Sequence, residues 1–261
     1  MDAWIIIIGN EILNGRVLDT NSNFLARELT MMGFNVRRII TVPDDMDEIV
    51  EVIRDAYRKS RIIITTGGLG PTFDDLTSEA LSRALGLEWV INRDAYRMVE
   101  EKYKAAGMEM TEERVKMARM PSMAKPLYNP VGTAPGILID YNDRIIVSLP
   151  GVPDEMKAIF EESVRGLLTK IAPRRIYLEE IYRIVGIPES SLAPLIKEVL
   201  RKYPNVYIKS HPRGRETRGP VIDLALSTYS RDVNESKKII QEIVGYIKEI
   251  TGITPIKQSK N

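Results

Sequence analysis

The first part of the chain alternates between two hydrophobic periods. Short apolar runs such as "AWIIIIG" (3–9) are typical of strands buried on both faces. Between such runs, apolar residues recur at helical spacing, as in "NSNFLARELTMMGF" (21–34). This regular alternation predicts mostly parallel strands with right-handed crossovers. The expected order is strand 3–9, helix 21–34, strand 35–42, helix 45–60 capped by Asp44 or Asp45, strand 61–65 and helix 76–86.

The rest of the sequence predicts the end of this α/β domain and a second, smaller domain. A helical stretch (93–118), two short strands (136–140 and 144–149) and a helix (152–171) complete a domain over 1–172. Composition changes at "APRR" (172–175). The pattern beyond it predicts a βαββα unit of the α+β class over 173–255 and a frayed tail over 256–261. Its elements are strand 176–184, helix 190–202, strands 205–210 and 220–229, and helix 233–250.

Composition excludes several classes of protein. The 37 basic and 36 acidic side chains nearly balance, which argues against bulk attraction to nucleic acid or anionic membrane. Cysteine is absent, which excludes disulfides, thiolate metal sites and cysteine nucleophiles. The start lacks signal-peptide character, and no apolar run approaches the ~20 residues of a membrane span. We therefore expect a cytoplasmic protein.

Four unusual loops fall at the carboxyl ends of predicted strands, where parallel α/β sheets bind their ligands. The third, "TGGLGPTFDD" (66–75), carries Gly67, Gly68 and Gly70, whose bare backbone can approach a phosphate or another anion closely. Thr66 and Thr72 add hydroxyl groups to the same loop. The other loops cover 9–22, 42–45, and 129–136 together with 149–155.

Acidic side chains gather at the same predicted rim. Asp74 and Asp75 can simply cap the following helix, because carboxylates are common at helix starts. Carboxylates beside a phosphate repel it, however, unless a cation lies between them. This favours a divalent cation such as Mg²⁺, with oxygen ligands drawn from the predicted set Glu11, Asp44, Asp74 and Asp75, while Glu155 lies at the same rim.

The motifs "GNEILNG", "TGGLGPTFDDLT", "NPVGTAPG" and "LPGVPDEM" closely resemble the signatures of the CinA family of competence/damage-inducible proteins. This resemblance implies a first domain with the three-layer αβα fold of the molybdopterin-binding MoaB and MogA proteins. It also implies a KH-type second domain. CinA relatives form dimers and MogA-like relatives form trimers, so we expect a homo-oligomer, with a dimer favoured and a trimer possible.

The resemblance further implies roles for individual residues. In molybdopterin relatives, the glycine loop receives a phosphate of the pterin or nucleotide, and two aspartates that match Asp44 and Asp75 are needed for adenylylation. In CinA proteins, the equivalent domain hydrolyses ADP-ribose to AMP and ribose 5-phosphate with a metal such as Mg²⁺, Mn²⁺ or Co²⁺. Full-length CinA proteins carry a further deamidase domain, which we do not expect in this chain, so we expect no nicotinamide mononucleotide deamidase activity.

A KH domain that binds RNA needs a Gly-x-x-Gly loop, and the nearest candidate here, "GIPE" (186–189), has one glycine. We therefore expect no nucleic-acid partner. The only histidine, His211, is predicted to be an exposed loop residue. A basic cluster in this domain is predicted to be a solvated face; it consists of Arg201, Lys202, Lys209, Arg213, Arg215 and Arg218.

The leading hypothesis is an enzyme that hydrolyses the pyrophosphate of ADP-ribose or a related nucleotide with a divalent cation. Asp44, Asp75 and Glu155 are its predicted catalytic acids. Asn129 and Thr133 contact ribose or phosphate in this hypothesis, although they can equally shape a turn. The alternatives are a molybdopterin-binding or adenylylating protein of molybdenum cofactor metabolism, and a non-catalytic nucleotide-binding regulatory module.

Overall fold

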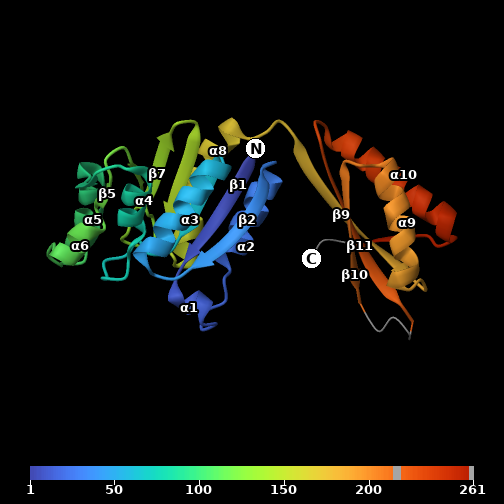
Figure 1. Ribbon diagram of the computed structural model, residues 1–261, viewed down its shortest axis with the longest axis horizontal. Helices are drawn as coiled ribbons and strands as arrows, with labels where there is room; N and C mark the ends of the chain where they lie inside the picture. The colour runs from blue at the N-terminus through green and yellow to red at the C-terminus, as the bar shows by residue number, and fades with distance from the viewer. Residues whose placement is uncertain (214–218, 259–261) are drawn as a thin grey trace. The chain divides into compact units, whose positions relative to one another are not determined.

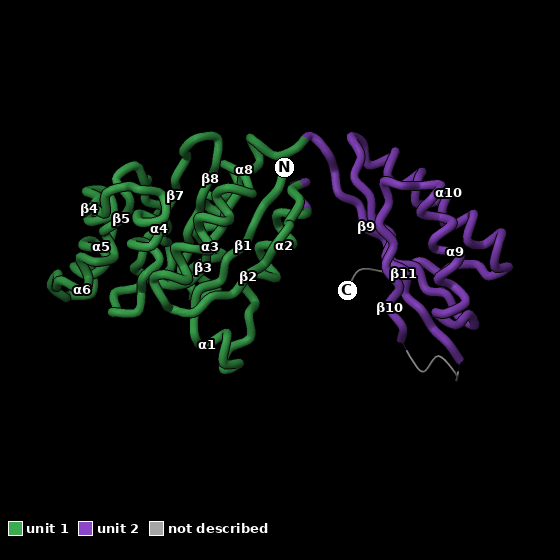
Figure 2. Tube along the Cα trace, viewed as in Figure 1, with its two compact units in different colours: residues 1–30, 34–173 green, residues 31–33, 174–261 purple. Residues whose placement is uncertain are grey.

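A computed structural model describes residues 1–213 and 219–258 of the chain (Figure 1). The chain folds into two compact units (Figure 2). Unit 1 comprises Met1–Thr30 and Phe34–Pro173, and unit 2 comprises Met31–Gly33 and the residues from Arg174 on. Within the described ranges, no helix is long and apolar enough to cross a membrane.

A six-stranded, mostly parallel sheet forms the centre of unit 1, in the order β2-β1-β3-β8-β7-β6. The first four strands in this order run parallel, and β7 and β6 each run antiparallel to their neighbour. This confirms the predicted fold class. The strands are β1 (Asp2–Ile8), β2 (Asn35–Val42), β3 (Ile62–Thr66), β6 (Lys125–Leu127), β7 (Gly136–Tyr141) and β8 (Arg144–Leu149), beside a separate two-stranded sheet of β4 (Trp89–Ile91) and β5 (Arg119–Pro121).

Helices cover both faces of this sheet, because β1 is apolar on both sides. Trp4, Ile6 and Ile8 pack in one core with residues of α3 and α4, whereas the alternate residues of β1 are buried on the other face. On that second face α2 meets the π-helical segment η1, where the rings of Phe24 and Phe160 lie 5.5 Å apart. The helices are α1 (Asn10–Leu13), α2 (Asn21–Met31), α3 (Met46–Lys59), α4 (Thr77–Leu85), α5 (Arg93–Ala105), α6 (Glu112–Lys116), α7 (Pro153–Ile159), η1 (Phe160–Val164) and α8 (Arg165–Ile171).

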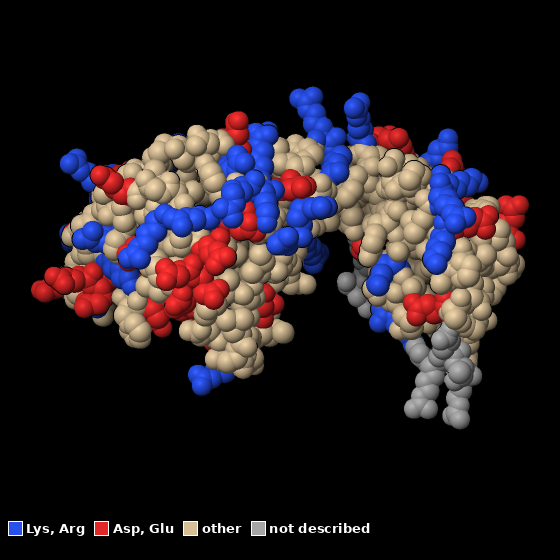
Figure 3. Space-filling view, in the orientation of Figure 1, with Lys and Arg blue, Asp and Glu red and all other residues tan. Residues whose placement is uncertain are grey.

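The charges of α3 complement its dipole. Asp47 and Glu48 lie in its first turn, while Arg58 and Lys59 lie in its last. Figure 3 shows acidic and basic side chains in separate patches over this face of unit 1. Of the two predicted caps of α3, Asp44 and Asp45, the structure shows Asp45 in this role: its side chain accepts hydrogen bonds from two amides of the first turn. Asp44 is therefore available for another role.

Unit 2 has an antiparallel sheet in the order β10-β11-β9-β12, with α9 and α10 packed on one face (Figure 1). The predicted frayed tail is wrong for Ile256–Gln258, which form a strand paired with β9; the rest of that tail lies outside the described residues. Arg215 and Arg218 of the predicted basic face also lie outside them. The elements are β9 (Ile176–Val185), α9 (Glu189–Lys202), β10 (Val206–Pro212), β11 (Val221–Ser230), α10 (Val233–Thr251) and β12 (Ile256–Gln258).

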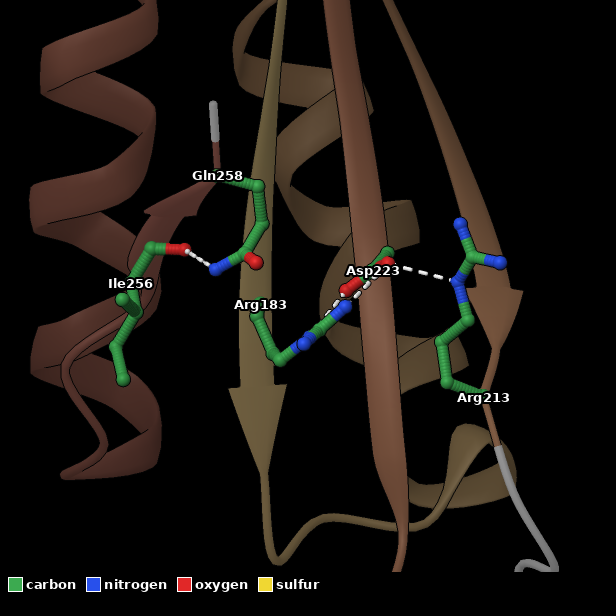
Figure 4. Close-up of polar contacts among 5 residues, drawn as sticks. All are labelled: Arg183, Arg213, Asp223, Ile256 and Gln258. Atoms are coloured by element: carbon green, nitrogen blue, oxygen red, sulfur yellow. Dashed lines mark hydrogen bonds and ion pairs between the residues drawn. The ribbon is translucent and has the colours of Figure 1, made fainter. Parts of the chain in front are cut away.

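In unit 2 a buried aspartate binds two arginines, one in the neighbouring strand β9 and one directly after the other neighbour, β10 (Figure 4). Asp223 in the central strand β11 is only 3% exposed, and its carboxylate accepts hydrogen bonds from Arg183 at 2.8 and 3.0 Å and from Arg213 at 2.8 Å. The hydrogen bonds from Arg183, followed by those from Arg213, hold the pKa of Asp223 below its usual range. His211, in β10 rather than in a loop, is exposed on the neighbouring strand.

Candidate functional site

Hydrogen bonds join the loops at the carboxyl edge of the unit 1 sheet. The amide of Gly9 donates to the carbonyl of Val42 at 3.2 Å, and the amide of Asn10 donates to Oδ2 of Asp44 at 2.8 Å. Asp44 therefore ties the loop after β2 to the start of α1. The carboxylate of Glu11 lies back over Gly9, where a Cβ would stand only 2.5 Å from its Oε1.

The glycine loop after β3 needs its glycines for conformation and for space. Gly67 and Gly68 have φ angles of 107° and 65°, in the left-handed region that side chains disfavour. A Cβ on Gly67 would collide with the carbonyl oxygen of Ile8, and one on Gly68 would collide with the hydroxyl of Thr77. The Gly67 amide already donates to the carbonyl of Leu149 at 3.0 Å, so it is engaged in the framework rather than in an anion cradle.

Asp74 and Asp75 do not cap the next helix. Leu76 occupies the N-cap position of α4, and no side chain makes a capping hydrogen bond there. Instead, Oδ2 of Asp75 accepts hydrogen bonds from the Thr72 amide at 2.8 Å and from the Thr72 hydroxyl at 2.6 Å. That hydroxyl also bonds to Asp74. The hydrogen bond from Thr72, together with backbone donation and the charge of Lys116, holds the pKa of Asp74 below its usual range.

The glycine loop forms one wall of a small surface pocket, with a volume of about 10 Å³, that two basic side chains also line. Lys116 from the end of α6 and Arg119 from β5 line it, and Trp89 of β4 contributes an aromatic wall. Nζ of Lys116 bonds to the carbonyl of Thr72, and the Arg119 guanidinium lies 5.4 Å from the centre of the Trp89 ring. We call this the glycine-loop pocket, and its principal residues are Gly68, Gly70, Asp75, Trp89, Lys116 and Arg119.

Lys116, Arg119 and Trp89 are not among the site residues predicted from the sequence. These residues lie some distance along the chain from the glycine loop, and no motif marks them. They reach the pocket because β4 and β5 pair antiparallel, with Ile91 opposite Arg119, and because α4 packs against β5. The mixture of one lysine and one arginine in "VKMAR" (115–119) is too common a pattern to indicate a site.

Asn129 shapes the loop before β7. This is the alternative that the sequence offered to a contact with ribose or phosphate. Its side-chain amide donates to the carbonyl of Ala134 at 2.9 Å and to Oε2 of Glu155 at 2.7 Å, while its Oδ1 accepts from the amides of Val131 and Gly132. With these contacts Asn129 is buried and shapes the turn. Its partner Glu155 lies against Gly132, where any Cβ would collide with the carboxylate.

Thr133 lies in the same loop, with its hydroxyl 4.0 Å from the sulfur of Met117, a residue that lines the glycine-loop pocket. This places Thr133 beside the pocket wall. Thr72, by contrast, belongs to the glycine loop, where its amide donates to Asp75 and its carbonyl accepts from Lys116.

Thr66 serves the framework of the site. It is buried, and its hydroxyl donates to the carbonyl of Pro150 at 2.8 Å while accepting from Nδ2 of Asn21 at 3.0 Å. The same Nδ2 donates to the carbonyl of Gly151 at 2.8 Å. Oδ1 of Asn21 is buried without a hydrogen-bond partner, which typically costs about 1–3 kcal/mol.

The structure does not gather Glu11, Asp44, Asp74 and Asp75 into one cluster. Across residues 1–213 and 219–258, no group of three or more acidic or histidine side chains could hold a metal ion. The physical reason is that separate partners hold the acids: Asp44 binds the Asn10 amide, whereas Asp74 and Asp75 both bind Thr72. Of these four acids, Asp75 lines the glycine-loop pocket, and Asp74 is linked to it through the shared Thr72 hydroxyl.

The geometry thus defines a class of protein. Its members have an α/β unit with a mostly parallel sheet and a glycine loop at the carboxyl edge of that sheet. Residues 4–170 match the family model described as "Probable molybdopterin binding domain". The chain belongs to this family. The match confirms the MoaB/MogA-like first domain.

Relatives match over nearly the whole chain. A protein of Pyrobaculum arsenaticum is 47% identical over 253 residues, covering 97% of this chain and 96% of its own length. A protein of Aeropyrum pernix is 44% identical, covering 96% and 95%. Among solved structures, the protein CinA of unknown function from Thermoplasma acidophilum is 41% identical with a TM-score of 0.61, covering 64% of this chain and 97% of that one.

Proposed function

We propose that unit 1 binds a phosphorylated pterin of the molybdopterin type, with its phosphate at the mouth of the glycine-loop pocket. The observation that carries this proposal is the meeting of a glycine loop, Lys116 and Arg119 in one pocket. Two basic side chains beside a glycine backbone suit an anion, because no Cβ atoms prevent the anion from approaching closely. The match of residues 4–170 to a molybdopterin-binding family supports the same ligand class.

Each side chain of the pocket has a defined part in this proposal. Arg119 supplies a planar fork of donors, whereas Lys116 acts as a point charge at the end of a flexible stem. Trp89 keeps the Arg119 guanidinium in place, since its ring lies beneath that group and its Nε1 donates to Ser78 at 3.1 Å. Asp75 holds Thr72 and, through it, the shape of the loop.

A divalent cation would be held here by Asp75, which lines the pocket, and by Asp74, which contacts the same Thr72 hydroxyl. Mg²⁺ is usually held by one or two carboxylates together with substrate phosphates, so the pair is sufficient when a phosphate is present. Bound there, the ion would offset the negative charge on phosphoryl oxygens. Asp44 and Glu11, which belong to the loops after β2 and β1, would take no part in holding it.

The second candidate is hydrolysis of ADP-ribose or a related nucleotide, the reaction that the CinA resemblance implies. The observation that favours it is the pair of carboxylates on the Thr72 hydroxyl beside an anion pocket, which also suits a pyrophosphate. In this reading Asp44, Asp75 and Glu155 remain the predicted catalytic acids. Adenylylation of molybdopterin would use the same pocket.

Binding can be measured through Trp89. The chain has two tryptophans, so Trp4→Phe leaves Trp89 as the only indole reporter. Titration with molybdopterin released anaerobically from a molybdoenzyme should quench its fluorescence. Lys116→Ala should weaken binding about tenfold or more, because a charged hydrogen bond is lost. The control is Lys170→Ala, which removes the same charge from an exposed position on α8. Equal affinity in the two variants would refute the pocket assignment.

Product analysis separates the candidate reactions. Incubation with ADP-ribose and Mg²⁺, Mn²⁺ or Co²⁺ should release AMP if the second candidate is correct. Incubation with molybdopterin, ATP and Mg²⁺ should give an adenylylated pterin if the protein is an adenylyltransferase. Pterin binding without either product supports a binding protein, while AMP release without any pterin binding would overturn the first proposal.

A further inference from the structure

The sheet of unit 2 has one face covered by helices and one open face. Ile222, Leu224 and Leu226 of β11 pack in one core with residues of α9 and α10. Because successive side chains of a strand point to opposite faces, Asp223 and Ala225 belong to the other face. Exposed side chains of the neighbouring strands share that face, and they are Val185 of β9, Tyr207, Lys209 and His211 of β10, and Ile256 of β12. We call it the open face of unit 2.

Four residues form one row across this open face. In register, Asp223 lies between His211 of β10 and Arg183 of β9. Ile256 of β12 follows on the other side of Arg183. Arg213 joins the row from the end of β10, and Figure 4 shows the two arginines approaching Asp223 from opposite sides. Neighbouring strands lie only about 4.8 Å apart, so one small ligand can contact several side chains of such a row.

Asp223 holds the two arginines but uses only part of their donors. Its two oxygens accept from Nε and Nη2 of Arg183, whereas Arg213 donates only from its Nε. Both Nη groups of Arg213 and the Nη1 group of Arg183 therefore make no hydrogen bond within the described part of the chain. The side chains of Arg183 and Arg213 are 38% and 60% exposed, so a ligand can reach them. Guanidinium groups that are held in place and keep free N–H groups are well suited to bind phosphate.

The local charge suits a dianion. Three basic side chains lie near the single carboxylate of Asp223, which leaves a net charge of +2 before any proton on His211. These basic side chains are Arg183, Arg213 and Lys209. Another carboxylate of the open face, Glu179, is four residues from Arg183 on β9, which is about 13 Å along the strand.

Stability alone does not explain why one buried carboxylate binds two arginines. Buried ion pairs can often be replaced by well-packed apolar residues without loss of stability. The next row of the same face has Ala225 opposite Ile181, so this face accepts apolar residues. Arg183 alone already donates to both oxygens of Asp223, and Arg213 therefore adds positive charge beyond what the carboxylate needs.

We propose that Arg183 and Arg213, held by Asp223, bind the phosphate group of a small phosphorylated molecule on the open face of unit 2. A phosphate monoester carries about two negative charges at pH 7, and its oxygens accept strong hydrogen bonds from guanidinium groups. The exposed side chains of Val185 and Ile256 border Arg183 and offer apolar contacts to the rest of the molecule. The near balance of basic and acidic residues in the chain favours a small molecule over a polyanion. This site is independent of the glycine-loop pocket, whose residues all belong to unit 1.

Inorganic phosphate is the probe for this site, and the Nε–H resonances of the arginines in nitrogen-edited NMR spectra of the full chain report on it directly. Titration with phosphate at constant ionic strength should shift the resonances of Arg183 and Arg213. The shifts should saturate with a dissociation constant of about 1 mM or below. Chloride at the same ionic strength should leave both resonances in place. Shifts that do not saturate, or an equal response to chloride, would overturn the proposal.

Arg213→Ala should weaken phosphate binding, followed at Arg183, about tenfold or more. Arg183 still binds Asp223 in this variant, so circular dichroism should show an unchanged fold. Arg213→Lys keeps the charge but not the planar fork, and it should weaken binding several-fold. The matched control is Arg231→Ala, which removes an exposed arginine after β11 and should leave the affinity within about twofold. Full affinity in Arg213→Lys, or equal losses in the two alanine variants, would overturn the proposal.

Two further arms identify the source of the phosphate and keep this site apart from the glycine-loop pocket. A single-stranded RNA of about ten nucleotides that binds more than tenfold tighter than phosphate, and loses this affinity in Arg213→Ala, would keep the phosphate chemistry but assign it to a nucleic-acid backbone. Lys116→Ala should leave the phosphate shifts of Arg183 unchanged, and Arg213→Ala should leave the quenching of Trp89 by molybdopterin unchanged. If Trp89 is quenched but Arg183 does not respond to phosphate, only this inference fails. If Arg183 responds but Trp89 is not quenched, only the proposed function fails.

Discussion

Asp75 combines a structural and an electrostatic role, and a single substitution can separate them. Asp75→Asn should keep the fold, since an amide oxygen can still accept from Thr72. Without divalent ions, affinity for a phosphorylated pterin should rise about fivefold, because about 1 kcal/mol of repulsion at 4 Å disappears. Any metal-dependent turnover should fall by an order of magnitude or more. Calorimetric titration with and without Mg²⁺ measures the first effect, and product analysis measures the second.

The matched control for that charge change is Asp45→Asn. Asp45 caps α3, and asparagine caps as well as aspartate does, so stability and binding should stay unchanged. Loss of folding in Asp75→Asn but not in Asp45→Asn would show that the Thr72 contacts need a full negative charge. Unchanged binding and turnover in Asp75→Asn would exclude Asp75 from the site.

Gly67 gives a second residue-scale prediction. Gly67→Ala forces a Cβ into the carbonyl of Ile8 at a φ of 107°, and we expect a loss of about 2–4 kcal/mol in the free energy of unfolding. Gly86→Ala also changes a glycine with a positive φ, of 68°, but open space surrounds the position, so it should cost about 1 kcal/mol. Urea unfolding measures both. Equal losses would mean that backbone conformation alone, rather than the close approach of β1 and β3, requires the glycine.

The site residues that sequence could identify are those whose chemistry depends on neighbours along the chain. The glycines after β3 and the adjoining acids form such a local group, and the structure places Gly68, Gly70 and Asp75 in one pocket. Lys116 and Arg119 reach that pocket only through tertiary packing. The predicted four-acid group failed to gather for the same reason, since sequence cannot show that Asn10 holds Asp44.

Whole strands and helices were more predictable than contacts, because burial on both faces leaves a continuous apolar run. Ile5 to Ile8 and Ile62 to Ile64 are at most 3% exposed, and each run is a strand. Strand β12 shows the limit. "IKQ" (256–258) has no apolar alternation, and it becomes a strand only because the edge of β9 is available for pairing.

The ion pairs of Asp223 with Arg183 and Arg213 make the free energy of unfolding depend on pH. Its pKa is lowered in the folded state, so the carboxylate contributes stability above the unfolded pKa of about 4, and this stability is lost as the pH falls through the folded value. Asp223→Asn should cost about 1–3 kcal/mol at pH 7, a figure reduced by the exposure of Arg183 and Arg213. Faster hydrogen exchange of β11 amides at pH 7, with the difference from the parent shrinking below pH 4, would agree with this. A constant difference across this range would contradict it.

At the scale of the whole molecule, unit 1 contains every residue of the glycine-loop pocket. It also has a complete sheet with helices on both faces. The predicted boundary after Ala172 lies one residue from the division of the two units at Pro173. The self-association implied by the CinA resemblance stays a prediction, which light scattering of the full chain measures.

A chain that ends at Pro173 should therefore fold and keep its ligand affinity within about twofold of the full chain. The only residues it would leave without their own unit are Met31–Gly33, the last residue of α2 and the turn that follows it. Far-UV circular dichroism and thermal unfolding test the fold, and Trp89 quenching in the Trp4→Phe background tests the site. A second truncation at Ile159, which removes η1 and α8, is the informative comparison, because it deletes Phe160, Val164 and Leu168 from the core. It should fail to fold cooperatively. If the longer truncate also loses cooperative unfolding, unit 1 depends on unit 2; if it unfolds cooperatively but no longer quenches, unit 2 contributes to the ligand site.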